Sequence, residues 1–142
     1  MSAYLDAVDF VRDLLLADSL LVNGSMDIGG IGARLFTDLA PNVDAQVYPF
    51  GIVSFNSGGA NNTFSTNLVE VRLLVKVIAE DMVQASFLGN RVYAVLHDAD
   101  AVAKVDFGVY ACEQVSAIHL ANLEAQRRFY HDGGVYRLRM SQ

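Results

Sequence analysis

The chain of 142 residues has a single cysteine, Cys112, which excludes an internal disulfide framework and any cysteine-rich zinc site. No basic residue flanks Cys112 in the sequence, so we expect a buried structural cysteine. Basic residues are also scarce. Ten lysines and arginines stand against sixteen aspartates and glutamates, giving a formal charge of −6. A negative net charge disfavours a protein whose main function is to bind the phosphate backbone of a nucleic acid.

The beginning of the chain lacks the features of a targeting segment. Residues 1–6 carry no basic stretch, and Asp6, Asp9 and Asp13 interrupt the apolar sequence that follows. Neither a signal peptide nor a membrane-spanning helix is expected from such a pattern. We therefore predict a protein that is made soluble in the cytoplasm and has no membrane partner.

Signatures of hydrolases, phosphate sites and calcium loops are missing as well. The chain has no Gly-x-Ser-x-Gly elbow, and the glycine-rich stretch 23–32 fits neither G-x-G-x-x-G nor the P-loop pattern. The acidic residues Glu80, Asp81, Asp98 and Asp100 lack the spacing of a calcium loop, so helix capping and solvation explain them better. The sequence predicts neither a cofactor nor a metal site.

The three histidines do not predict catalysis. His97 and His131 each precede an aspartate, and His119 lies in a predicted strand. Side chains adjacent in sequence point apart on a helix or a strand, so such neighbours rarely form a histidine–carboxylate relay. We therefore expect no catalytic residues and no enzymatic activity.

The composition is that of a folded domain with a substantial core. Hydrophobic residues make up 53% of the chain and charged residues 18%. A chain of this length forms one domain, and its apolar excess leaves surface for a subunit contact.

Two helices are predicted from apolar periodicity. Over 2–17 apolar residues recur at steps of three and four, while the aspartates share another face. Asp81 is placed to cap a second helix, whose apolar face runs through His97.

Strands are predicted at 33–37, 46–56, 66–78 and 109–120, followed by a turn at Asp132-Gly133-Gly134 and a terminal strand over 135–140. Strict alternation makes 66–78 the clearest of these strands. Pro49 favours an edge or initial position for the strand before it. The intervening residues 57–65 are polar and too many for a tight turn, which predicts a hairpin with a long loop.

These elements predict an α+β fold. Sequential hairpins favour antiparallel pairing, so we expect a mostly antiparallel sheet of about four to five strands with two main helices packed on it. We predict one domain over 1–142, with flexible segments at about 23–32 and 57–65.

Charged and polar clusters are the candidate subunit interface. A basic strand face and an acidic helix face on one chain offer complementary patches for head-to-tail contact, and a long polar loop can order itself on a neighbour. Solvated surface charge is the ordinary alternative. The candidate residues are Asp6, Asp9, Asp13, Asn61, Asn62, Phe64, Arg127, Arg128, Arg137 and Arg139.

The order of several motifs resembles a known family. The sequence presents Leu14-Leu15-Leu16-Ala17-Asp18 in its first helix, then a Gly-x-Arg-Leu-Phe step from Gly32 to Phe36, and then Tyr48-Pro49-Phe50-Gly51-Ile52-Val53. Glu70 to Val77 follows as a central strand, Val92 to Asp98 as the end of the second helix, and Asp132 to Arg139 as the closing strand. In order and spacing this pattern resembles the tail completion or tail terminator proteins of long-tailed bacteriophages.

The resemblance implies a structural virion subunit without catalysis. Members of that family form a ring, expected to be a homo-hexamer, at the head-proximal end of the tail tube, where it stops tube polymerisation and meets the neck. The implied partners are further copies of the chain, the tail tube protein and a neck or head-completion protein. DNA would pass the channel without specific binding, which suits an acidic subunit.

Two alternatives remain at this point. A neck or head-completion connector would bind the portal side instead of ending the tube. A small cytoplasmic ligand-binding or enzymatic α+β domain would show convergent polar groups in a pocket and a titrating residue with a perturbed pKa.

Overall fold

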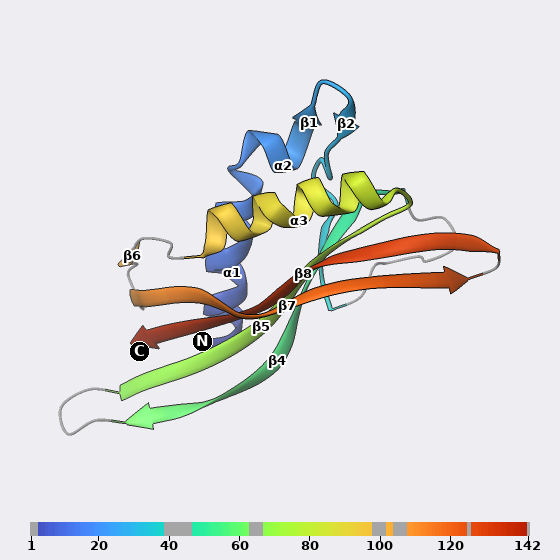
Figure 1. Cartoon of the computed structure of the whole chain (residues 1–142). Helices are drawn as coiled ribbons and strands as arrows, with labels where there is room; N and C mark the ends of the chain where they lie inside the picture. Colours follow the sequence, from blue (N-terminus) through green and yellow to red (C-terminus); the bar gives the residue numbers. More distant parts are fainter. Residues whose placement is uncertain are drawn as a thin grey trace.

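The computed structural model describes residues 3–38, 47–62, 67–97, 102–103, 108–124 and 126–141. Figure 1 shows the arrangement of the elements. The helices are α1 (Ala3–Leu16), α2 (Ser19–Asn23) and α3 (Met82–Leu96), and the strands are β1 (Gly24–Ser25), β2 (Ile28–Gly29), β3 (Leu35–Thr37), β4 (Phe50–Asn62), β5 (Asn67–Ala79), β6 (Val102–Ala103), β7 (Gly108–Glu124) and β8 (Arg127–Ser141). None of the described helices is long and apolar enough to cross a membrane.

The main sheet has six strands in the order β3-β4-β5-β8-β7-β6. The short β3 pairs with β4 in parallel, and the other neighbours pair antiparallel. Two long hairpins, β4–β5 and β7–β8, extend to opposite ends of the sheet, because the start of β5 lies beside the end of β8 (Figure 1). A separate two-stranded ribbon, β1–β2, lies within the glycine-rich segment 23–32.

The predicted fold, a mostly antiparallel sheet of four to five strands under two main helices, is wrong. The molecule is mostly sheet, with six strands in one curled sheet, a parallel pair at one edge, and α3 as the main helix beside smaller helical elements. The strands are longer than predicted because β4, β7 and β8 continue through residues whose composition suggests loops.

Helix α3 confirms the predicted amphipathic segment and its cap. The Asp81 side chain accepts a hydrogen bond from the amide of Gln84 at 3.2 Å, which satisfies one of the free donors of the first turn. His97 is the C-terminal cap. The predicted first helix is confirmed as α1, and its continuation α2 is capped by Asp18.

The main core lies between the helices and one face of the sheet. Alternate residues of β5, from Val71 to Val77, point into it and meet the apolar stripes of α1 and α3. Tyr136 and Cys112 belong to the same cluster, and burial raises the pKa of the Cys112 thiol to about 12. Cys112 is therefore the buried structural cysteine that the sequence predicts.

A smaller apolar cluster lies on the opposite face of the sheet, which we call the second face. It consists of Phe50, Ile52, Ile78 and Phe129, with Phe36 and Tyr48 packed against them. The Tyr48 and Phe129 rings stack at 4.9 Å between centroids. This cluster fixes β3 and the start of β4 against the β7–β8 hairpin.

Two predicted connections are strands. Residues 57–62 of the predicted loop 57–65 belong to strand β4. A bulge between Phe55 and Ser57 shifts the register of β4 against β5. Residues 63–66 lie outside the described part of the chain.

The predicted turn at Asp132-Gly133-Gly134 is wrong, because these residues lie in the middle of β8. A Cβ on Gly133 would lie 2.1 Å from the carbonyl oxygen of Val75, and one on Gly134 would lie 2.4 Å from that of Ser116. The two glycines therefore let β8 approach both neighbouring strands closely, which is a packing role rather than a turn.

Replacing Gly133 by alanine tests this packing role. We expect Gly133→Ala to lower the free energy of unfolding by about 1–3 kcal/mol or more, since the methyl group must displace a backbone carbonyl of the central strand β5. Gly29→Ala is the matched control, because a Cβ there meets only the Gln84 side chain at 3.5 Å, an ordinary contact. Denaturant unfolding measures both. Equal stabilities of the two variants would contradict the packing role.

Candidate functional site

The second face carries a band of charged side chains across the three central strands. These side chains alternate with the core residues of the same strands, so they point away from α1 and α3. The register places Arg137 between Arg72 of β5 and Glu113 of β7, and it places Arg139 beside Glu70.

The predicted basic residues Arg137 and Arg139 belong to an ion network within the chain. Arg137 hydrogen-bonds Glu113, and its Nε lies 4.0 Å from Glu70 Oε1. Arg139 Nε lies 3.9 Å from the same oxygen, and Arg72 Nε lies 3.4 Å from Glu70 Oε2. The side chain of Arg137 is only 24% exposed, whereas that of Arg139 is 52% exposed. Of the predicted pair, Arg139 is therefore the residue more available to a partner.

A half-buried lysine lies on the second face as well. Lys76 has Ile52 and Gly133 as its cross-strand neighbours, and the structure pairs it with no carboxylate within the described ranges. Burial lowers the pKa of Lys76 because the charged ammonium loses solvation. Three arginines, two glutamates and this lysine give the band a positive balance in a chain of net charge −6.

The second basic pair, Arg127 and Arg128, lies at the end of the β7–β8 hairpin. Arg127 is ion-paired with Glu80 at 2.7 Å, and its guanidinium lies over the rings of Tyr48 and Phe129. Arg128 is exposed, and no ion pair joins it to the other described residues. Arg127 thus supports the hairpin, and Arg128 is free to meet a neighbour.

The predicted acidic helix face is only partly exposed. Asp9 and Asp13 lie on the exposed side of α1, whereas Asp6 is buried. Asn61 and Asn62 are the last residues of β4, where their backbones pair with Leu68 and Asn67. Phe64 lies outside the described residues. The structure therefore does not gather the ten predicted residues into one patch but distributes them over both faces and the strand ends.

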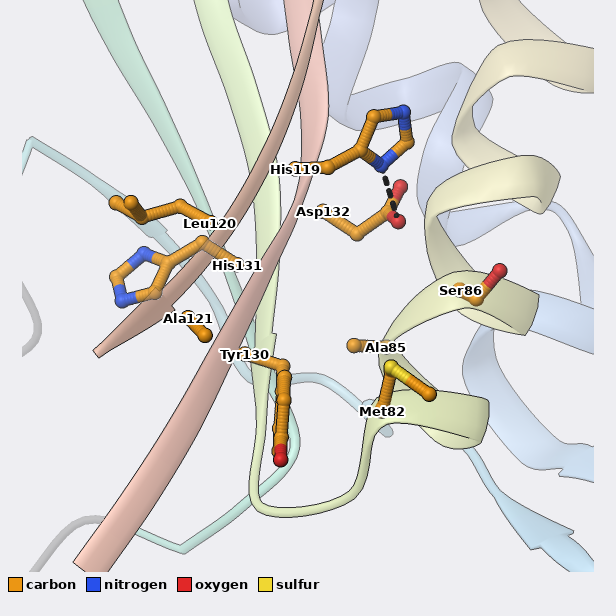
Figure 2. A pocket seen from close by; sticks show the side chains of 9 residues that line it. All are labelled: Met82, Ala85, Ser86, His119, Leu120, Ala121, Tyr130, His131 and Asp132. Carbon is orange, nitrogen blue, oxygen red and sulfur yellow. Dashed lines mark hydrogen bonds and ion pairs between the residues drawn. The ribbon is translucent and has the colours of Figure 1, made fainter. Parts of the chain in front are cut away.

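A pocket that is not evident from the sequence lies between α3 and the β7–β8 hairpin (Figure 2). Its volume is about 350 Å³, and its lining includes Met82, Leu120 and Tyr130. A second hollow of about 200 Å³ lies farther along α3 and includes Tyr93 and Gln114. His119 and Asp132 line both hollows.

The two shared residues are directly opposite each other on β7 and β8. His119 Nδ1 lies 2.8 Å from Asp132 Oδ2, and Asp132 is only 7% exposed. Burial raises the pKa of Asp132, and the bond with His119 partly opposes that shift. Gly89 of α3 makes room for the carboxylate, since a Cβ there would lie 1.9 Å from Asp132 Oδ1.

The chemistry of this pair is limited by its surroundings. Ser86 lines the same pocket, but the described side chains include no hydrogen bond between Ser86 and His119 (Figure 2). The pair therefore lacks the activated nucleophile of a hydrolytic triad. No group of three or more histidine, cysteine, aspartate or glutamate side chains with the geometry to hold a metal ion occurs within the described ranges.

The pair is not evident from the sequence, because the Asp132-Gly133-Gly134 pattern predicts the hairpin turn at the wrong place. A turn at Asp132 separates His119 from Asp132, whereas the observed connection near Gln126 brings them into register. Gln126 has a φ of 66°, the left-handed conformation that such a turn requires. His97, one of the two histidines that precede an aspartate in the sequence, accepts a hydrogen bond from the Gln114 amide through Nδ1 at 3.1 Å.

The raised pKa of Asp132 predicts a pH-dependent stability. The folded chain holds the Asp132 proton more tightly than the unfolded chain, so this residue contributes more stability below its ordinary pKa than above its raised one. The difference in unfolding free energy between the wild type and Asp132→Asn should therefore rise as the pH falls from 7 to 4. Urea unfolding across this range measures the difference.

His119→Gln provides the matched control for that experiment. It removes the interaction that opposes the raised pKa of Asp132, so the pH dependence of stability should become steeper. A difference between wild type and Asp132→Asn that does not change with pH would contradict the assignment.

Comparison with known proteins supports the fold. No protein-family model and no curated protein sequence matches the chain. Among solved structures, the fold is similar to that of a chain in the "Virion of native gene transfer agent (GTA) particle", with a TM-score of 0.63 and 19% sequence identity. The likeness covers 93% of this chain and 92% of that chain, so the two share one fold over nearly their whole lengths.

Proposed function

We propose that this protein is a structural virion subunit, a tail terminator or tail completion protein of a phage-like particle. It forms a ring, most simply a homo-hexamer, at the head-proximal end of the tail tube, where it stops tube polymerisation and joins the tail to the neck. The observation that carries this proposal is the fold shared with a chain of a virion particle over more than nine tenths of both chains. The order of sequence motifs supports the same assignment independently.

The distribution of surfaces suits a ring subunit. Such a subunit needs one surface for the tube, one for the neck, and two lateral surfaces that join neighbours head to tail. The exposed aspartates of α1 and the arginine-rich band of the second face lie on opposite sides of the sheet. Stacking surfaces of opposite charge on one subunit favour a fixed orientation in the assembly.

The charge of the chain fits a channel for DNA. A subunit of net charge −6 repels the phosphate backbone overall, so DNA passes the ring without specific binding. The tail tube protein and a neck or head-completion protein are the other proposed partners.

We further propose that the subunit is not an enzyme. The His119–Asp132 pocket is the feature that would favour the competing assignment, a small ligand-binding or enzymatic domain. The buried carboxylate has a sufficient structural role, because it packs against Gly89 of α3 and joins β8 to β7 through His119.

Electron microscopy of particles produced with this gene disrupted tests the proposed role. Overlong tubes that are not attached to filled heads are expected, because nothing would stop tube growth. Tubes of normal length that fail to join heads would overturn the terminator role in favour of a neck connector. Intact particles would overturn the virion assignment. Restoring the gene in trans is the control and should return tubes to normal length.

A further inference from the structure

The outermost long strands of the sheet, β4 and β7, are only partly covered by the short edge strands β3 and β6 within the described part of the chain. Strand β3 pairs only with 51–53 of β4, and β6 pairs only with Gly108 and Val109 of β7. Farther along β4, the Tyr4 hydroxyl accepts a hydrogen bond from the backbone amide of Phe55. On β7, the His97 side chain accepts a hydrogen bond from the backbone amide of Gln114. Beyond these points, 56–62 and 115–124 have no strand partner on their outer sides among the described residues.

The composition of these free edges is unusual for a protein that works as a monomer. Monomers protect exposed edges with lysine, proline or inward charges, because an open strand edge binds other strands. The β4 stretch Asn-Ser-Gly-Gly-Ala-Asn-Asn has no charge, and the β7 stretch has only His119 and Glu124 as ionisable residues. Exposed apolar side chains accompany the β7 edge, with Leu120 at 54% and Leu123 at 66% exposure.

The directions of the strands make the two edges complementary. The four long strands β4, β5, β8 and β7 are antiparallel at each step, so β4 and β7 run in opposite directions. A second copy in the same orientation therefore places its β4 antiparallel to β7 of the first. Because the two free stretches lie at opposite ends of the sheet, the second copy must also be shifted along the strand direction to bring them side by side. Repetition of this contact is head to tail, and it closes into a ring when the rotation per subunit divides a full turn.

We propose that copies of this chain join by β-sheet pairing between the free edge of β4, 56–62, and the free edge of β7, 115–124, of the next copy. This inference rests on the proposed ring and names its lateral contact. The backbone groups of both edges supply the hydrogen bonds, and Leu120 and Leu123 supply apolar area. The sheet then continues from subunit to subunit, and each copy uses one edge of each kind.

Cysteine pairs across the two edges test the proposal. Ser57 on β4 and Ser116 on β7 are exposed, and both lie on the second face, opposite Arg72 and Val135. Ser57→Cys should be combined in turn with Ser116→Cys, Ile118→Cys and Leu120→Cys, which sample successive positions of that face. Oxidation of the assembled protein should give a ladder of covalent oligomers for at least one combination, read on a non-reducing gel.

The controls separate the contact from the assembly. Ser57→Cys with Val83→Cys on α3 should give no ladder, and a single cysteine variant should give dimers at most, since Cys112 is buried. Assembled rings, seen by mass photometry, in which none of the three edge pairs cross-links would overturn the edge contact while the ring proposal stands. Protein that stays monomeric at high concentration, and also when tail tubes are added, would overturn both the edge contact and the ring proposal.

Hydrogen–deuterium exchange provides a second readout without substitutions. Ring formation should slow exchange at alternate amides of 56–62 and 115–124, because every second amide of an edge strand points outward. Slowed exchange on α1 and α3 with none on these edges would overturn the proposal.

Discussion

The close packing of β8 between β5 and β7 is the constraint on which the rest of the structure depends. This strand pairs along nearly its whole length on both sides, and its middle is Asp132-Gly133-Gly134. Side chains at the two glycines would collide with backbone carbonyls of the neighbouring strands. Glycine costs conformational entropy in a strand, and here that cost is offset by long-range pairing that a larger residue would prevent. The same strand also contributes residues to both faces of the sheet, with Asp132 against α3 on one side and Arg137 in the charged band on the other.

The same strand carries Asp132, a buried carboxylate that faces the helix layer. Because Gly89 of α3 has no Cβ, the helix lies directly over the Asp132 carboxylate. The carboxylate is desolvated there and retains His119 as its partner across the hairpin. The buried carboxylate therefore has a hydrogen-bond partner within the chain and needs no ligand in the pocket to satisfy it.

The sequence predicts those elements that have strong apolar periodicity. Helices α1 and α3 and strand β5 each show a period that one buried face imposes, and Asp81 is recognisable as a cap. Periodicity does not reveal 57–62 of β4 or the middle of β8, because glycine and small polar residues there owe their extended conformation to neighbouring strands. For a related reason, charge alone does not reveal which of the candidate interface residues are exposed and unpaired within the described ranges. Arg137 and Arg127 are ion-paired within the chain, and Asp6 is buried, which only the tertiary contacts decide.

The strand stretches that periodicity misses include one edge of the proposed contact between subunits. If 57–62 formed a polar loop, β4 would have no long free edge, and side chains would make up the lateral surface of the subunit there. As an extended strand, the same residues present a row of backbone donors and acceptors at one side of the sheet. The four long strands β4, β5, β8 and β7 alternate in direction, so β4 and β7 are antiparallel. Backbone pairing depends little on side-chain identity, so it tolerates extensive sequence change as long as the strands stay extended. The proposed contact therefore does not require chains that share this fold to have similar sequences.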